Sequence, residues 1–203
     1  MTDIESALSD IGRIRDQLAA STRFQGFTPA VIALTGCLAI ALAALQTVQS
    51  ELSDQPILLF VTWILLALIC AFLIATDAIA RARRLHRAMA DTMLNTTLRH
   101  FLPVCAAGGV IAFILLTRAP QVVWTLPGLW QILVSIGVFA ALANLPRLTV
   151  LVAGWYFLCG AVSLILASGN GLASPWMMGL PFGIGQLLAA LVFHNASKGG
   201  LRG

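Results

Sequence analysis

Residues 64–74 read Ile-Leu-Leu-Ala-Leu-Ile-Cys-Ala-Phe-Leu-Ile, and this stretch decides the class of fold. It is apolar at every position, whereas a strand of a membrane barrel would alternate polar and apolar residues. A backbone in lipid must satisfy its own hydrogen bonds, and an unbroken apolar run does so as a helix. No charged residue occurs between Asp54 and Asp77, which leaves the length that a membrane-spanning helix requires. The sequence therefore predicts a transmembrane helix over 56–76.

The rest of the chain has the same character. Of its 203 residues, 59% are hydrophobic and 10% are charged, and the mean hydropathy is +0.92. Because soluble domains carry about 25% charged residues, a soluble enzyme, a disordered chain and a nucleic-acid-binding domain are excluded. The predicted fold class is an all-α polytopic membrane protein with a six-helix transmembrane domain over 24–197. Its uncharged runs predict spans at 28–48, 56–76, 101–117, 128–145, 148–167 and 177–194.

Three prolines stand near the starts of predicted spans, namely Pro29, Pro56 and Pro103. Proline is tolerated in the first turn of a helix because its missing N–H has no intrahelical acceptor there. We therefore expect each of these three helices to begin within a turn of its proline.

The basic residues predict the orientation. Six spans place both termini on one face, and that face would carry eleven of the twelve Lys and Arg residues, leaving Arg118 on the other. The positive-inside rule then places both termini in the cytoplasm. Arginine far outnumbers lysine in a chain rich in Ala, Gly and Leu, which is typical of proteins from GC-rich bacterial genomes. We therefore expect a multi-pass protein of the bacterial inner membrane, with a short cytoplasmic tail over 198–203.

Residues 1–23 precede the first span and predict a cytoplasmic amphipathic helix. An apolar stripe at heptad spacing runs along it, formed by Ile4, Ala7, Ile11, Ile14 and Leu18. Acidic residues lie off this stripe. Because so short a helix is marginal alone in water, we expect its stripe to dock on another helix.

The segment 77–100 predicts a cytoplasmic helical extension of the second span, since neither Gly nor Pro interrupts it. Leu85 and Met89 would lie on one stripe of that helix. Four arginines make the segment basic: Arg81, Arg83, Arg84 and Arg87. One interpretation is that the acidic N-terminal helix docks here, within one chain or across a homo-oligomer. The other is that the arginines fix the topology and contact lipid phosphates.

The predicted spans contain no Asp, Glu, Lys or Arg. Catalysis and ion coupling inside membranes depend on such residues, so we predict no enzyme, no catalytic residue, no metal and no cofactor. The three histidines, His86, His100 and His194, all fall on the predicted cytoplasmic side. They could form a metal, haem or pH-sensitive site, but interfacial residues with polar tips in the headgroups explain them more simply.

The sixth span is the least regular, because Gly179, Pro181 and Gly183 fall in one half of it and Gln186 follows. Broken helices at membrane depth can mark transporter binding sites, so these four residues are candidate ligand-binding residues. The structural interpretation is a packed kink whose glycines admit a neighbouring helix. Other polar residues within the spans are candidates for hydrogen bonds between helices: Gln131, Ser135, Asn144 and Ser163.

Two function classes follow from these features. The first is a non-enzymatic membrane scaffold or sensor that acts through its cytoplasmic helices, with lipid and either a second copy or a cytoplasmic protein as partners. The alternative is a small facilitator of a neutral or hydrophobic solute that uses the kinked sixth helix.

Overall fold

The computed structural model describes residues 28–49, 56–85, 87–170 and 174–199, and no strand occurs among them. Six long helices fill these ranges, namely α2 (Pro29–Val48), α4 (Pro56–Leu85), α5 (Arg87–Arg118), α6 (Leu126–Ala141), α7 (Thr149–Asn170) and α8 (Trp176–Gly199). Two short 3-10 segments flank α6, namely η1 (Pro120–Thr125) and η2 (Leu142–Asn144). Six helical segments are long and apolar enough to cross a membrane, which confirms the all-α, multi-pass prediction. The predicted helix over 1–23 lies outside the described residues.

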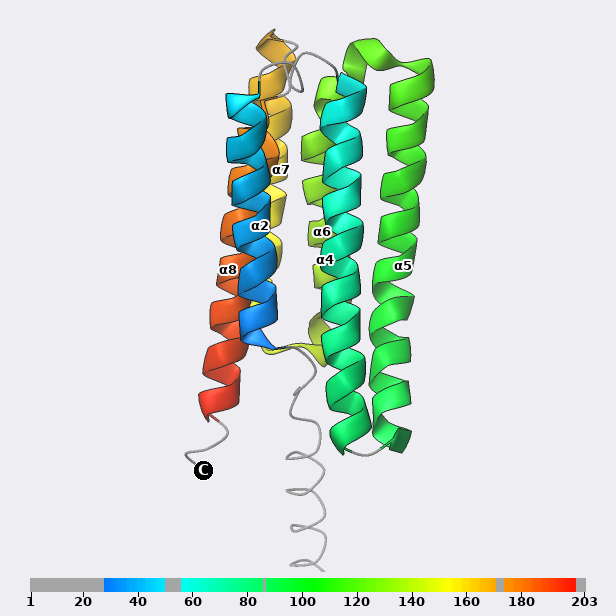
Figure 1. Cartoon of the computed structure of the whole chain (residues 1–203), viewed down its shortest axis with the longest axis vertical. Helices are drawn as coiled ribbons and strands as arrows, with labels where there is room; N and C mark the ends of the chain where they lie inside the picture. The colour runs from blue at the N-terminus through cyan, green and yellow to red at the C-terminus, as the bar shows by residue number, and fades with distance from the viewer. Residues whose placement is uncertain (1–27, 50–55, 86, 171–173, 200–203) are drawn as a thin grey trace, which may run out of the picture.

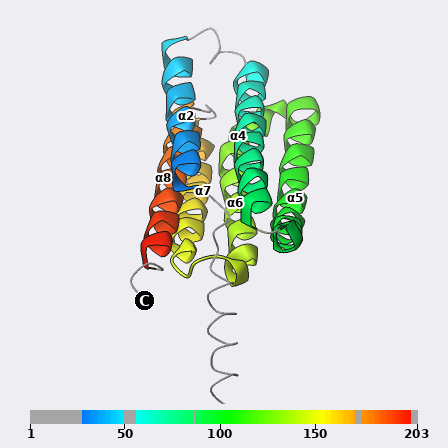
Figure 2. The same cartoon turned by 60° about the horizontal axis from the view of Figure 1, so that its bottom comes forward.

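The six helices form a single ring of neighbours (Figure 1). The most extensive interfaces join α2 to α8 and α6 to α7. Smaller ones join α7 to α8, α6 to α5 and α5 to α4, and the thinnest closes the ring between α4 and α2. The end of the bundle where α2 begins and α8 finishes is called the proximal end here, and the opposite end the distal end (Figure 2).

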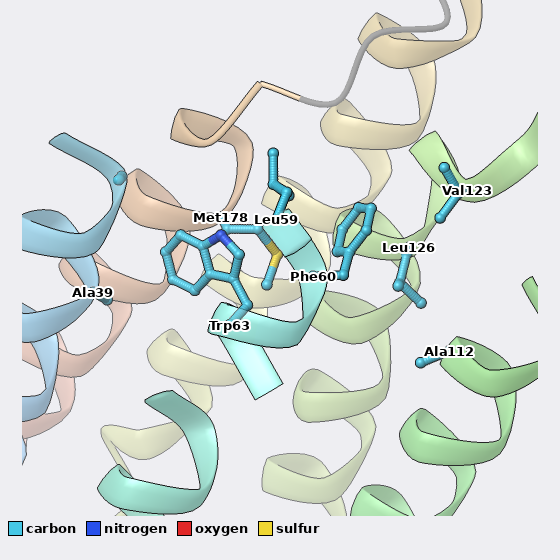
Figure 3. Packing of buried hydrophobic residues seen from close by; sticks show 9 residues of the cluster. Ala39, Leu59, Phe60, Trp63, Ala112, Val123, Leu126 and Met178 are labelled. Atoms are coloured by element: carbon cyan, nitrogen blue, oxygen red, sulfur yellow. The ribbon is translucent and has the colours of Figure 1, made fainter. Parts of the chain in front are cut away.

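Two apolar clusters fill the bundle. The distal cluster has these buried members: Ala39, Ala43, Leu59, Phe60, Trp63, Ala112, Val123, Leu126 and Met178 (Figure 3). Within it, the ring of Phe60 meets that of Trp130 edge to face at 6.0 Å. The proximal cluster joins α2, α7 and α8 and consists of Ile32, Val152, Tyr156, Ala189, Ala190 and Val192. The buried members of the proximal cluster include no residue of α4 or α5.

The predicted extension over 77–100 is divided between two helices. α4 ends at Leu85 and α5 begins at Arg87, so the segment forms a helical hairpin and not one continuous helix. α4 has 30 residues and α5 has 32, which gives lengths of about 45–48 Å at 1.5 Å per residue. Both helices are therefore longer than the hydrocarbon core, which is about 30 Å thick. The hairpin that they form extends past the proximal end of α2 (Figure 1).

Two of the three proline predictions are confirmed. Pro29 and Pro56 are the first residues of α2 and α4. Pro103 instead lies inside α5, which begins at Arg87. That prediction was wrong because it took the start of the apolar run as the start of the helix. The preceding segment is rich in Arg, Leu and Met, which favour helix, so the helix starts well before the membrane span.

Candidate functional site

The candidate ligand-binding glycines of α8 lie against α2. A Cβ at Gly179 would collide with Ala43, and one at Gly183 would collide with Ile40. On the α2 side, a Cβ at Gly36 would lie 2.8 Å from the carbonyl oxygen of Gly183. These glycines therefore let two helix backbones approach closely, as small residues do at membrane helix interfaces. The contacts support the packing interpretation, and ligand binding here stays a prediction.

Pro181 is buried inside α8. Because proline has no N–H, the carbonyl four residues earlier, that of Met177, loses its helical donor. Nε2 of Gln131 in α6 donates to this oxygen at 2.7 Å. The Gln131 side chain is 0% exposed, and its Oε1 accepts a hydrogen bond of 3.4 Å from Oγ of Ser163 in α7. Gln131 thus satisfies the carbonyl that the proline leaves open, which is how membrane helices tolerate proline.

Further polar side chains also bond between helices. Nε1 of Trp155 in α7 donates to the carbonyl oxygen of Pro181 at 2.9 Å. Oγ of Ser135 in α6 donates to the carbonyl oxygen of Ala153 in α7 at 2.8 Å. The prediction that Gln131, Ser135 and Ser163 bond between helices is therefore confirmed. The side chain of Asn144 lies outside the described residues.

Gln186 lies next to a residue that sequence reasoning missed. Tyr156 is 2% exposed, its side chain lies beside that of Gln186, and its buried hydroxyl makes no hydrogen bond to the described residues. The ring fits over Gly185, where a Cβ would lie 2.6 Å from Oη. Its centroid lies 5.4 Å from that of Phe182. The available signal was that Tyr156 is the single tyrosine of the chain and stands within an apolar span.

A glutamine joins α2 to α4 at the distal end. Gln46 is 1% exposed. Its Nε2 donates to Oγ1 of Thr62 at 2.6 Å and to the carbonyl oxygen of Leu59 at 3.3 Å. Its Oε1 accepts from Nε1 of Trp63 at 2.9 Å. These bonds of Gln46 are called the distal tie.

A second tie joins the same two helices at the proximal end. Thr28 is the N-cap of α2, and its backbone N–H donates to Oδ2 of Asp77 in α4 at 3.1 Å. The Thr28 hydroxyl donates to the same oxygen. A carboxylate is favourable at a helix N-terminus because it satisfies an unpaired N–H and faces the positive end of the helix dipole. This proximal tie was also missed by sequence reasoning, which considers Asp77 only within its own segment.

The two ties have matching spacings on the two helices. Thr28 and Gln46 are 18 positions apart, and so are Leu59 and Asp77. Eighteen residues make five helical turns, so each pair shares one face and spans about 27 Å. This separation is close to the thickness of the hydrocarbon core, which is about 30 Å. The line of contact between them is called the α2–α4 seam.

The predicted docking residues are only partly described. Ile4, Ile11, Ile14 and Leu18 lie outside the described residues. Leu85 and Met89 were predicted on one helix, but they lie in α4 and α5, on either side of the hairpin turn. The arginines lie at that turn: Arg81, Arg83 and Arg84 at the end of α4 and Arg87 at the start of α5.

His194 is exposed near the end of α8, and the side chains of His86 and His100 lie outside the described residues. The described part of the chain contains no group of three His, Cys, Asp or Glu residues that could hold a metal. No family model, curated protein or solved structure matches this chain. The contacts above therefore carry the functional inference.

Proposed function

We propose that this protein is a non-enzymatic membrane scaffold or sensor that acts through its cytoplasmic helices. The proximal tie is the observation that supports this proposal most. Thr28 directly follows the N-terminal segment, and Asp77 stands where α4 begins to extend past α2. Thr28, to which the N-terminal segment is joined in the chain, therefore lies beside the point where α4 extends past α2.

The proximal tie also identifies which face of α4 is turned toward α2. Arg81 and Arg84 stand four and seven positions after Asp77 in the same helix, and such positions share one face. Leu85 adds an apolar residue to that face. The N-terminal segment carries four acidic residues, Asp3, Glu5, Asp10 and Asp16, against three basic ones, Arg13, Arg15 and Arg23. The amphipathic helix that the sequence predicts over 1–23 is joined to the chain at Thr28, and we infer that it docks on this arginine-bearing part of α4.

The interior of the bundle supports a scaffold more than a facilitator. Four polar side chains inside the bundle form hydrogen bonds between helices, namely those of Gln46, Gln131, Ser135 and Trp155. The alternative function would use α8, but its two candidate glycines contact α2.

The location and partners follow from the charges and the surface. The positive-inside rule assigns the basic proximal end to the cytoplasm of a bacterial cell. Large apolar side chains such as Leu68, Phe72, Phe113 and Leu158 are exposed around the bundle, which is compatible with contact to lipid. A second copy of the chain or a cytoplasmic protein would be the partner that competes for the docked helix.

A charge-reversal experiment tests the docking. In full-length protein in lipid nanodiscs, with the four native cysteines replaced by alanine, Ser9→Cys and Ala80→Cys supply a thiol cross-linking pair, because Ala80 stands three positions after Asp77 and four before Arg84 and so shares their face. Asp10→Arg with Asp16→Arg is expected to lower the cross-linking yield roughly two- to tenfold, because exposed ion pairs contribute about 0.2–1 kcal/mol each. Adding Arg81→Glu and Arg84→Glu should restore the yield.

The matched control for this experiment is Arg83→Glu, which changes the same charge off the Asp77 face. It should not restore the yield. Docking on this face is refuted if the Arg81 and Arg84 reversals fail to rescue, or if Arg83→Glu rescues equally well.

A further inference from the structure

One polar site in the bundle lacks the direct hydrogen bonds that others have. Gln46, Gln131 and Ser135 each bond to a neighbouring helix. The hydroxyl of Tyr156 in α7 is buried and makes no hydrogen bond to the described residues, although the side chain of Gln186 in α8 lies beside it. Buried polar groups are almost always paired, either with protein groups or with ordered water. The Tyr156 hydroxyl therefore requires a partner other than the surrounding helices.

A second hydroxyl on the same face of α7 is also unpaired. Thr149 is 3% exposed, and its Oγ1 has no partner among the described residues. It stands seven positions before Tyr156, and positions seven apart differ by only about 20° around an α-helix. Ser135 of α6, by contrast, bonds directly to a carbonyl oxygen of α7. Unpaired hydroxyls thus recur along one face of α7 and are not confined to a single side chain.

The Tyr156 hydroxyl lies at a meeting point of three helices. Its ring lies over Gly185 of α8, where an added Cβ would be 2.6 Å from Oη. Toward α2, a Cβ at Gly36 would be 3.0 Å from Cβ of Gln186. Gln186 therefore starts beside α2 and its side chain lies beside a residue of α7. These two side chains are called the Tyr156–Gln186 site.

The Tyr156–Gln186 site lies well inside the bundle. Gly36 stands eight positions after Thr28, so the site is about 12 Å along α2 from its start. Phe182, one turn before Gln186 on the same face of α8, packs against both apolar clusters, so this face looks into the bundle. Gln186 is nevertheless only half-buried. A molecule of the size of water can therefore reach its side chain.

The chemistry of the site selects an occupant that is uncharged and very small. No Asp, Glu, Lys or Arg lies within α2 or between Arg147 and Lys198, so an ion buried here would have no opposite charge beside it, which is costly. The ring of Tyr156 and the backbone of Gly185 are in direct contact, which leaves no space between them for a larger ligand. Water satisfies both limits, and a buried water requires two to four polar partners.

We propose that Tyr156 and Gln186 hold a buried water molecule between α2, α7 and α8. The phenol hydroxyl and the Gln186 carboxamide each bond to this water, which joins α7 to α8. Gln186 is then the candidate ligand-binding residue of α8 that touches a bound molecule, whereas Gly179 and Gly183 contact α2. The inference goes beyond the proposed function, because the water is held whether or not the N-terminal helix docks.

X-ray radiolytic footprinting of the full-length protein in lipid nanodiscs tests the site without any substitution. Hydroxyl radicals formed from a bound water oxidise the side chain beside it, even where bulk water has no access. Trp63 is the internal reference, because it is 4% exposed, its ring reacts readily with the radical, and its Nε1 bonds directly to Gln46. Tyr156 should be oxidised severalfold faster than Trp63. Gln186→Leu should slow the oxidation of Tyr156 and leave that of Trp63 unchanged.

Tyr156→Phe distinguishes a hydroxyl that is bonded to water from one that has no partner. Loss of a bonded hydroxyl should raise the equilibrium constant for unfolding about two- to tenfold, which corresponds to a typical hydrogen bond. Loss of an unpaired hydroxyl should lower that constant, because burial of the group without a partner destabilises the folded protein. Unfolding in mixed micelles of rising sodium dodecyl sulfate fraction measures the change.

The buried water is overturned if Tyr156 is oxidised no faster than Trp63, or if Tyr156→Phe lowers the unfolding constant. Oxidation of Tyr156 that rises only after lipid is stripped from the protein would assign the site to a lipid group and would also overturn it.

Discussion

Gly36→Val is expected to lower the free energy of unfolding by about 2–3 kcal/mol, at the upper end of the usual cost of overpacking. An added Cβ would lie 2.8 Å from the carbonyl oxygen of Gly183 and 3.0 Å from Cβ of Gln186. The first of these atoms belongs to the backbone of α8 and cannot rotate away. The two helices must separate along the most extensive interface of the bundle.

Unfolding of the purified protein in mixed micelles of rising sodium dodecyl sulfate fraction measures this change. Gly109→Val is the matched control, because a Cβ at Gly109 meets nothing within 4 Å. It introduces the same β-branched side chain into the interior of a helix and should change stability by less than about 1 kcal/mol. Equal losses in the two variants would show that the substitution acts through helix propensity and not through the contact between α2 and α8.

Gln131→Leu is expected to cost about 1–3 kcal/mol, the usual penalty for a buried carbonyl left without its donor. The loss should depend on Pro181. In a Pro181→Ala background the restored N–H of residue 181 can donate to the Met177 carbonyl. Gln131→Leu should therefore lower the free energy of unfolding by less in that background than in the native protein. The expected coupling between the two sites is on the order of 1 kcal/mol.

The same micelle titration on the two single variants and the double variant measures that coupling. Ser163→Ala serves as the control, because it removes only the 3.4 Å bond to Gln131 and leaves the Met177 carbonyl satisfied. Additive losses for Gln131→Leu and Pro181→Ala would contradict the assignment of Gln131 as the partner of the open carbonyl.

The number and class of the helices could be predicted from the sequence, because the membrane imposes a length and a lack of charge that can be read one residue at a time. The hairpin turn near Leu85 and the interior position of Pro103 could not. Their causes lie in the polar segment before the third span, which continues as helix without being apolar. Apolar runs mark where a helix crosses lipid and not where it begins.

Which helices pack against each other could also not be predicted from the sequence. Gly36 and Gly183 meet although they are far apart in the chain, and a single sequence gives no register between distant segments. The glycines of α8 could be recognised as unusual, but whether they meet a ligand or a helix depends on the neighbour. The contact between Thr28 and Asp77 could not be predicted for the same reason. Neither residue stands out within its own segment, and only their contact gives them a role.

A distance measurement decides whether the N-terminal helix docks on α4. Spin labels at Ser9→Cys and Ala88→Cys, in full-length protein free of its native cysteines and held in lipid nanodiscs, report the separation between the N-terminal segment and the hairpin. Docking predicts one narrow distribution at short distance, which broadens when Arg81 and Arg84 are both changed to Glu. A broad distribution that is the same with and without the two arginines would contradict it.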